Sequence, residues 1–247
     1  MLTRLYNLAC VILYVSIILL NFQEVNIIKN SIQIRLLGLI GGLLLNAFGN
    51  GLCISGNAGS GLWTASAVNL SKLTNTSVGV ILFALGMINI LTNQILIHHW
   101  DIRRFIGEFC FIFFFSYFVN TFAQFFNYLG IPTLPFLIRG LISCLGVVFF
   151  CTAISLYQRA NIIMHPNDDT TNLLRFLYLK GNSTAAQLLD FIVPIVIIIF
   201  CAIFSHKLFA VNIATLFSFL FNGLIIAEAD RLIFPQLKHN FKKNEQH

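Results

Sequence analysis

Long, continuous runs of apolar residues recur along the chain from one end to the other. Each run is close to the ~20 residues with which an α-helix crosses about 30 Å of hydrocarbon. The runs do not alternate polar with apolar residues, as lipid-facing β-strands would. The pattern predicts an all-α, polytopic helical membrane protein with about seven spans, at residues 5–22, 35–55, 77–98, 104–128, 136–157, 184–205 and 208–230.

The composition excludes a soluble protein. Of the 247 residues, 57% are hydrophobic and only 10% are charged, and the mean hydropathy is +0.84. A soluble domain of this length cannot bury so much apolar surface, so the lipid bilayer is the expected partner of most of the surface. No cleavage site of small residues follows the first apolar run, which we therefore interpret as a retained span and not as a signal peptide.

The positive charges predict an orientation in the membrane. The net charge is +6, but the basic residues are scattered at the ends of the apolar runs, so no nucleic-acid partner is expected. Seven crossings place the termini on opposite sides, and only four of the 15 Lys and Arg residues then fall on one side: Arg4, Lys72, Arg139 and Lys207. Because cytoplasmic loops carry the excess of Lys and Arg, the N-terminus is predicted outside and the C-terminus in the cytoplasm.

The chain contains a weak internal duplication. When the sequence is shifted against itself by 104 residues, Arg35 falls on Arg139 and, in the same frame, Asn57 falls on Asn161. Each unit has three spans, and an odd number forces the two units into opposite orientations, as in the inverted repeats of many transporters. The predicted organisation is an additional N-terminal span and linker (1–34), repeat one (35–128), repeat two (129–235) and a basic cytoplasmic tail (236–247).

Each repeat has a polar break after its first span, followed by a short helix. The first is expected over residues 64–73 with Thr64 as N-cap, and the second over 168–180 with Asn167 as N-cap. A ten-residue helix is ~15 Å long, about half the hydrocarbon thickness. Two such helices could enter from opposite faces and meet near the midplane, or both could lie flat on the membrane surface as amphipathic helices.

Polar residues at the two breaks are the candidate site. A broken helix leaves backbone groups unpaired, which in lipid need partners or a wet cavity. Asn and Asp side chains can supply those partners, so a structural role competes with a binding role. The proposed substrate-binding residues are Asn57, Ser60, Trp63 and Thr64 in the outer half, and Asn161, Asn167, Asp168 and Asp169 in the cytoplasmic half. Asp190, an acid within a predicted span, is a candidate ion or proton site.

The stretch "GNGLCISGNAGSGLWTASAVNLSKLTNTSVGVILFALG" resembles the first half of the YczE/YyaS/YitT group of bacterial multipass membrane proteins. Residues 61–64 stand where that group shows Gly-Pro-Trp-Asp; Trp63 is kept, but the Pro and Asp are absent. "HPNDDTTNLLRF" and "VNIATLFSFLFNGLIIAEADRLIFP" resemble its second half, and the likeness covers about 35–235. The resemblance implies a bacterial inner-membrane protein, often guessed to be a transporter. It also implies that Thr64 has removed a charge from the outer half of the site.

Two functions remain open. The repeat and the paired breaks favour a secondary transporter or permease for an unidentified small solute. The alternative is a non-transporting accessory or scaffold protein for another membrane enzyme or exporter. The Phe-rich run at 109–118 could be a lipid face, or a face for a second copy or another membrane protein. An enzyme is not expected, because adjacent acids on a helix point about 100° apart and form no facing pair. The six cysteines show no metal-ligand spacing, so neither a metal nor another cofactor is expected.

Overall fold

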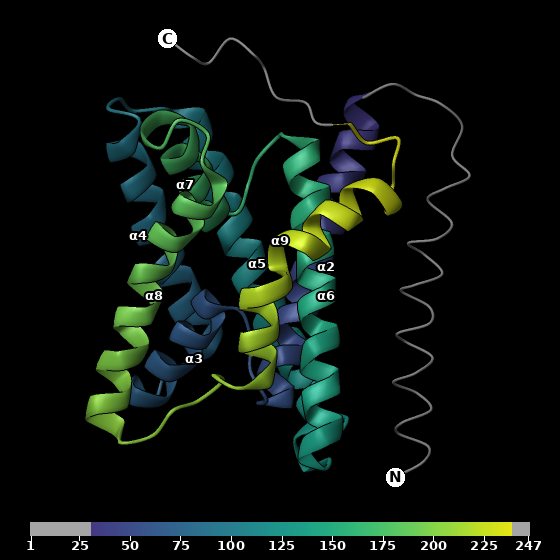
Figure 1. The fold of residues 1–247 in the computed structure, drawn as a ribbon, viewed down its shortest axis with the longest axis vertical. Coiled ribbons are helices and arrows are strands. Elements are labelled where there is room, and N and C mark those ends of the chain that lie inside the picture. The colour runs from purple at the N-terminus through teal and green to yellow at the C-terminus, as the bar shows by residue number, and fades with distance from the viewer. Residues whose placement is uncertain (1–30, 239–247) are drawn as a thin grey trace.

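The computed structural model describes residues 31–238, and within this range every regular element is a helix (Figure 1). In chain order the elements are α2 (Ile32–Gly56), α3 (Leu62–Thr74), α4 (Val78–Leu96), α5 (Ile102–Tyr128), the 3₁₀ turn η2 (Ile131–Thr133), α6 (Phe136–Ala160), α7 (Pro166–Leu173), the π-helical turn η3 (Leu174–Tyr178), α8 (Ser183–Ser205) and α9 (Ile213–Leu232).

Six of the described helices are long and apolar enough to cross a membrane: α2, α4, α5, α6, α8 and α9. They correspond to six of the seven predicted spans, and the seventh, at 5–22, lies outside the described residues. The last span begins at Ile213 and not near 208, because the Asn212 side chain accepts the backbone N–H of Ile213 and caps the helix there.

Helices α2 and α6 pack against each other as an antiparallel pair, with α5 beside α2 and α9 beside α6. We call this pair the central helices. Their closest approach is at Gly49 and Gly146, where an added Cβ on Gly49 would lie 2.5 Å from the Gly146 carbonyl oxygen, and one on Gly146 would lie 2.6 Å from the Gly49 carbonyl oxygen. Only residues without a side chain allow two backbones to come this close. The two glycines therefore fix the spacing of the central helices.

The same two helices cap each other at both ends. Arg35, in the first turn of α2, donates from Nε to the carbonyl of Ala160 (2.7 Å) and from a terminal nitrogen to the carbonyl of Asn161 (2.5 Å). Arg139, in the first turn of α6, donates to the carbonyl of Gly56 (3.3 Å) at the end of α2. These contacts give partners to carbonyl groups that a helix end leaves unpaired.

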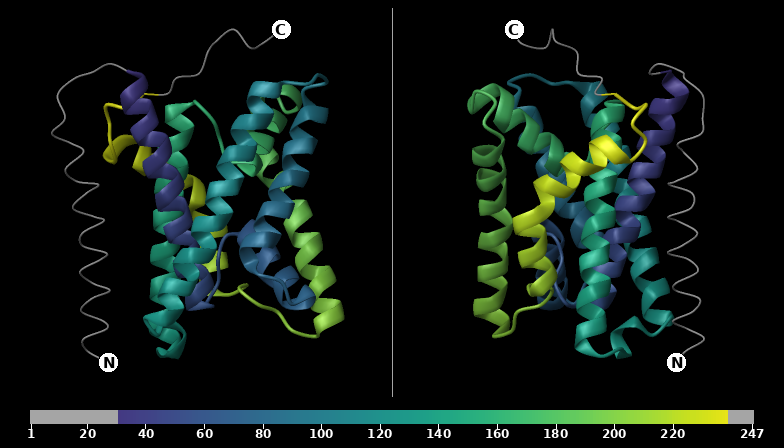
Figure 2. Two further views of the ribbon diagram at one scale, coloured as in Figure 1. Left: turned by 180° about the vertical axis from the view of Figure 1, so that it is seen from behind. Right: turned by 45° about the vertical axis from the view of Figure 1, so that its right-hand side comes forward.

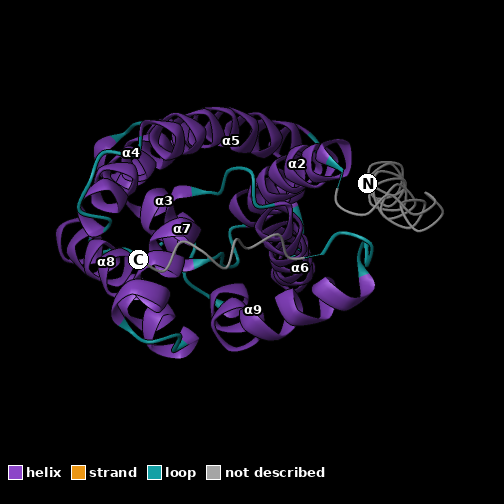
Figure 3. Ribbon diagram, turned by 90° about the horizontal axis from the view of Figure 1, so that it is seen from above, coloured by secondary structure: helices purple, strands orange, loops and turns teal. Residues whose placement is uncertain are grey.

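The short helices α3 and α7 lie inside the ring formed by the six long helices (Figure 3). Helix α3 occupies the lower half of the bundle and α7 the upper half, and the other views agree (Figures 1 and 2). Each short helix packs against both α4 and α8. Most of α3 is buried, so this helix is enclosed by its neighbours and does not lie along the outer surface of the bundle.

Both short helices begin earlier than predicted. Helix α3 starts at Leu62 with Gly61 at the N-cap, so Thr64 lies within its first turn. Helix α7 starts at Pro166, a favoured first residue because proline has no N–H to leave unpaired. The ring nitrogen Nδ1 of His165 then accepts the N–H of Asn167 at 3.3 Å, so His165 takes the capping position predicted for Asn167. The predicted helix 168–180 is divided, with α7 ending at Leu173 and η3 following.

Candidate functional site

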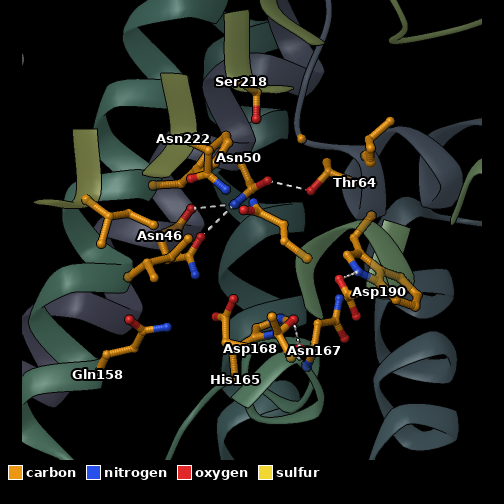
Figure 4. Close-up of a pocket in the computed structure, with 18 of the residues that line it drawn as sticks. Asn46, Asn50, Thr64, Gln158, His165, Asn167, Asp168, Asp190, Ser218 and Asn222 are labelled. Atoms are coloured by element: carbon orange, nitrogen blue, oxygen red, sulfur yellow. Dashed lines mark hydrogen bonds between the residues drawn. The ribbon is translucent and has the colours of Figure 1, made fainter. Parts of the chain in front are cut away.

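A cavity of about 230 Å³ lies where the starts of α3 and α7 face each other (Figure 4). Its wall also includes residues of α2, α6, α8 and α9, so both halves of the chain contribute. The polar lining includes seven neutral amides: Asn46, Asn50, Gln158, Asn167, Asn172, Gln187 and Asn222. The cavity thus brings polar side chains together between apolar helices.

A chain of hydrogen bonds joins α2, α3 and α6 on one wall of the cavity. Asn46 and Asn50 are one helical turn apart on α2, and the Asn50 amide donates to the Asn46 side-chain oxygen at 2.7 Å. The Thr64 hydroxyl donates to the Asn50 side-chain oxygen, and the Asn46 amide donates to the Tyr157 hydroxyl at 3.3 Å. These bonds fix the orientation of each group that faces the cavity.

Asp168 lies in the first turn of α7 and accepts a hydrogen bond from the Tyr157 hydroxyl. Burial raises the pKa of Asp168 to about 6; the Tyr157 hydrogen bond acts in the opposite direction, and the neighbouring Asp169 adds to the increase. Burial lowers the pKa of His165, in the adjoining loop, to about 3. At neutral pH the carboxyl of Asp168 is therefore mostly charged and the imidazole of His165 is neutral.

Asp190 on α8 is the second acid in the cavity wall. Its Oδ2 accepts a hydrogen bond of 2.7 Å from the indole Nε1 of Trp63, at the start of α3. Within residues 31–238 its Oδ1 has no hydrogen-bond partner, although the side chain is buried. No acid lies at the Thr64 break itself, so Asp190 of α8 provides the carboxyl group next to the start of α3.

Five of the nine predicted site residues line the cavity: Trp63, Thr64, Asn167, Asp168 and Asp190. The other four do not, and each has a structural contact elsewhere. Asn57 and Asn161 are the left-handed C-caps of α2 and α6, with φ of 47° and 45°. The Ser60 backbone N–H donates to the Thr215 hydroxyl at 3.1 Å, and Asp169 pairs with Arg104 at 2.7 Å.

The ion pair of Asp169 belongs to a buried network that holds α7 against α4 and α5. Arg104 also lies 3.9 Å from Glu108, the helical pair that its spacing predicts, but the contact with Asp169 is much closer. The Asn93 amide donates to both Glu108 oxygens at 3.1 Å, and its oxygen accepts from the Thr170 hydroxyl at 2.7 Å. This network positions Asp168 through the helix that carries it.

Sequence reasoning missed part of the wall. Asn46 and Asn50 were not expected at the site, although two asparagines four residues apart in an apolar helix share one face, which is a signal for a polar contact. Nothing in the sequence singles out Tyr157, whose hydroxyl reaches Asp168 because the chain turns between the end of α6 and the start of α7. Within the described residues, no cluster of three His, Cys, Asp or Glu side chains is placed to hold a metal ion.

The fold and the enclosed polar cavity define a polytopic α-helical membrane protein. The chain belongs to the family described as a family of unknown function (DUF6198), whose model matches residues 33–231. No curated protein and no solved structure matches the chain.

Proposed function

We propose that the protein is a secondary transporter or permease for a small solute, which binds in the cavity between the two breaks. One observation carries the proposal: two short helices from opposite ends of the bundle meet at a polar cavity inside a ring of apolar helices. Polar groups at such depth are costly unless they meet water or a ligand. The volume is below the ~300–1,000 Å³ of drug-sized sites, which favours a small solute. The proposed role is binding and passage, with no catalytic step.

Inverted repeats are part of the proposal, and reciprocal contacts support them. Arg35 and Arg139, which the 104-residue shift aligns, each cap the central helix of the other half. The shift also aligns Trp63 with Asn167. Trp63 bonds Asp190 on α8, and Asn167 bonds Asn89 on α4, so each short helix bonds to the other half. A two-fold axis in the membrane plane exchanges the two halves, so it produces each of these contacts twice.

The proposed location is the bacterial cytoplasmic membrane, as the resemblance to the YczE/YyaS/YitT group implies, with the C-terminus in the cytoplasm. The charge distribution supports this orientation. Three basic residues lie at the end of the bundle where α3 terminates: Lys72 in the last turn of α3, Arg139 in the first turn of α6, and Lys207 just after α8. The other basic residues of the described chain belong to the opposite end: Arg35, Arg103, Arg104, Arg159, Arg175, Lys180, Arg231 and Lys238.

Cysteine labelling tests the opposite orientation of the halves. Thr74 closes α3 and Tyr178 closes η3, and both side chains are exposed. In a background without the native cysteines, a membrane-impermeant maleimide added outside should label Thr74→Cys and leave Tyr178→Cys unlabelled until the membrane is opened. Labelling of both positions from one side would contradict the inverted repeat.

Filling the cavity tests transport. Ser218 is buried on α9 and lines the cavity, so Ser218→Phe should occupy the solute's space and reduce uptake at least about tenfold. Leu220→Phe, on the exposed face of the same helix, is the matched control and should leave uptake unchanged. Uptake is measured in proteoliposomes against a panel of radiolabelled amines, amino acids, sugars and organic acids. If no member enters above the level of empty liposomes, while the folded protein co-purifies with a stoichiometric membrane partner, an accessory role replaces transport.

A further inference from the structure

The Oδ1 atom of Asp190 is a hydrogen-bond acceptor that the described chain leaves unused. The side chain is only 7% exposed, and it lines the cavity. Its other oxygen is held by the Trp63 indole, which fixes the orientation of the carboxylate. A buried carboxylate oxygen without a partner is costly. The Asp190 carboxylate is therefore incompletely compensated by the described chain, and it lies at the wall of the cavity.

The charges around the cavity do not balance. Asp168 and Asp190 are both in the wall, and among the described residues Arg175 is the only Arg or Lys that lines it. The Arg175 Nε donates to the Gly181 carbonyl at 3.0 Å, and the guanidinium lies 4.9 Å from the Phe176 ring centroid. His165 adds no charge, because burial lowers its pKa to about 3. With both carboxyls ionised, the wall therefore lacks one positive charge.

The helix N-termini, which on electrostatic grounds alone would suit an anion, already face carboxylates. Asp168 lies in the first turn of α7, and Asp190 is bonded to the first turn of α3 through Trp63. An anionic solute would have to approach both acids. Two isolated helix starts would prefer an anion. With these two carboxylates in place, the cavity prefers a cation.

Aromatic rings make up much of the remaining wall: Trp63, Phe115, Phe150, Tyr157 and Phe191. The face of an aromatic ring attracts a cation, and cages of this kind recognise ammonium groups that carry apolar substituents. The cavity is also several times the ~30 Å³ share of one water molecule, so it has room for more than a bare ion. Both features favour an organic ammonium ion over an alkali metal ion.

We propose that the cavity binds a small monovalent organic ammonium ion, with its positive charge near the carboxyl groups of Asp190 and Asp168. The identity of the transported solute rests on the proposed function, whereas the binding does not. The two can therefore be tested separately.

Trp63 provides a direct measure of binding. The chain has two tryptophans, so Trp100→Phe, at an exposed position, leaves Trp63 as the sole indole. We expect choline and tetramethylammonium to change the Trp63 emission of the purified protein in a saturable way. The neutral analogue 3,3-dimethylbutan-1-ol has the shape of choline without the charge, and it should bind at least about tenfold more weakly, equivalent to ~1.4 kcal/mol.

Asp190→Asn isolates the charge. Asparagine keeps an oxygen that can accept the Trp63 indole, so the variant should fold and elute as the parent does, but its affinity for choline should fall at least about tenfold. Glu228→Gln removes an acid from the exposed end of α9 and should leave the affinity unchanged. Direct calorimetric titration with choline repeats the comparison without relying on the indole.

The affinity should also depend on pH. The pKa of Asp168 is about 6, so its carboxylate is present above that pH and is lost below it, and choline affinity should weaken as the pH falls from 7 to 5. The titratable groups around Asp168 are Tyr157 and Cys151 from α6, Asp190 from α8, and His165, Asp169 and Arg175 from its own segment. Asp168→Asn should reduce this dependence.

Three results would overturn the proposal: equal affinity for choline and its neutral analogue, unchanged affinity in Asp190→Asn, or no effect of choline on Trp63 while sodium alone perturbs its emission. The first two would exclude a carboxylate site for an ammonium ion, and the third would indicate an alkali ion. If the protein takes up a neutral or anionic solute and Ser218→Phe blocks that uptake, the transport proposal is supported and the ammonium site is contradicted. Asp190-dependent choline binding without uptake of any solute would support the ammonium site and contradict the transport proposal.

Discussion

Replacement of Arg159 by Met is expected to cost about 3–5 kcal/mol of folding stability, the usual cost of breaking a buried ion pair. Arg159 is 1% exposed near the end of α6, and its guanidinium lies 3.3 Å from an Asp230 carboxylate oxygen. It also donates to backbone carbonyls of and beyond the last turn of α9: Asp230, Ile233, Phe234 and Leu237. Methionine fills a similar volume but donates nothing, so these oxygens would lose a partner at once.

The measurement is the midpoint of thermal unfolding, followed by fluorescence-detected size exclusion in detergent. Arg231→Met is the matched control, because its ion pair with Glu228 is exposed and spans 3.5 Å on the surface of α9. Such pairs contribute ~0–1 kcal/mol, so this variant should melt close to the parent. Arg159→Lys should be intermediate, since an ammonium has three donors against five. Equal midpoints for Arg159→Met and Arg231→Met would show that the buried arginine does not hold α9 to α6.

The second large effect is expected from a single methyl group at the contact of α2 and α6. In Gly49→Ala, the new Cβ would lie 2.5 Å from the Gly146 carbonyl oxygen and 2.8 Å from the Phe150 backbone nitrogen. Backbone atoms cannot rotate away as a side chain can, so the two central helices must separate. We expect a destabilisation of at least about 1–3 kcal/mol, as for other overpacked sites, and the same for Gly146→Ala.

The controls lie in the same helices. An added Cβ at Gly41 in α2, or at Gly140 in α6, meets nothing within 4 Å. Because alanine favours a helix over glycine by ~0.5–1 kcal/mol, Gly41→Ala and Gly140→Ala should be neutral or slightly stabilising. Unfolding midpoints for the four variants test this directly. A loss at all four positions would indicate a general intolerance of the helices, and a loss at none would contradict the close approach at Gly49.

The sequence was sufficient to locate the six described helices that are long and apolar enough to cross a membrane, because continuous apolar runs of this length seldom occur outside helices that cross a bilayer. It also located both breaks, where Asn57 and Asn161 end the helices as left-handed caps. The sequence placed the starts of the two short helices, α3 and α7, a few residues too late. Gly61 and His165 act as their caps through local geometry that residue types alone do not show.

The site was predicted in part for a related reason. Residues next to a break, such as Trp63 and Asp168, could be assigned from position along the chain. Asn50 and Tyr157 could not, because they lie within long helices and only the folded arrangement shows that they face the cavity. Asp190 was marked as an acid within a span, but its bond to the Trp63 indole joins residues 127 positions apart. A linear pattern does not contain that contact.

The exchange of arginine caps between α2 and α6 has a consequence for biogenesis. Arg139 is synthesised 83 residues after Gly56. When α2 leaves the ribosome and enters the bilayer, the carbonyl of Gly56 therefore lacks its arginine donor. The first half can therefore insert, but the end of α2 does not receive its arginine cap until the second half has been synthesised and inserted. Two half-chains produced together should consequently rescue each other, whereas either produced alone should be recognised as unassembled and degraded.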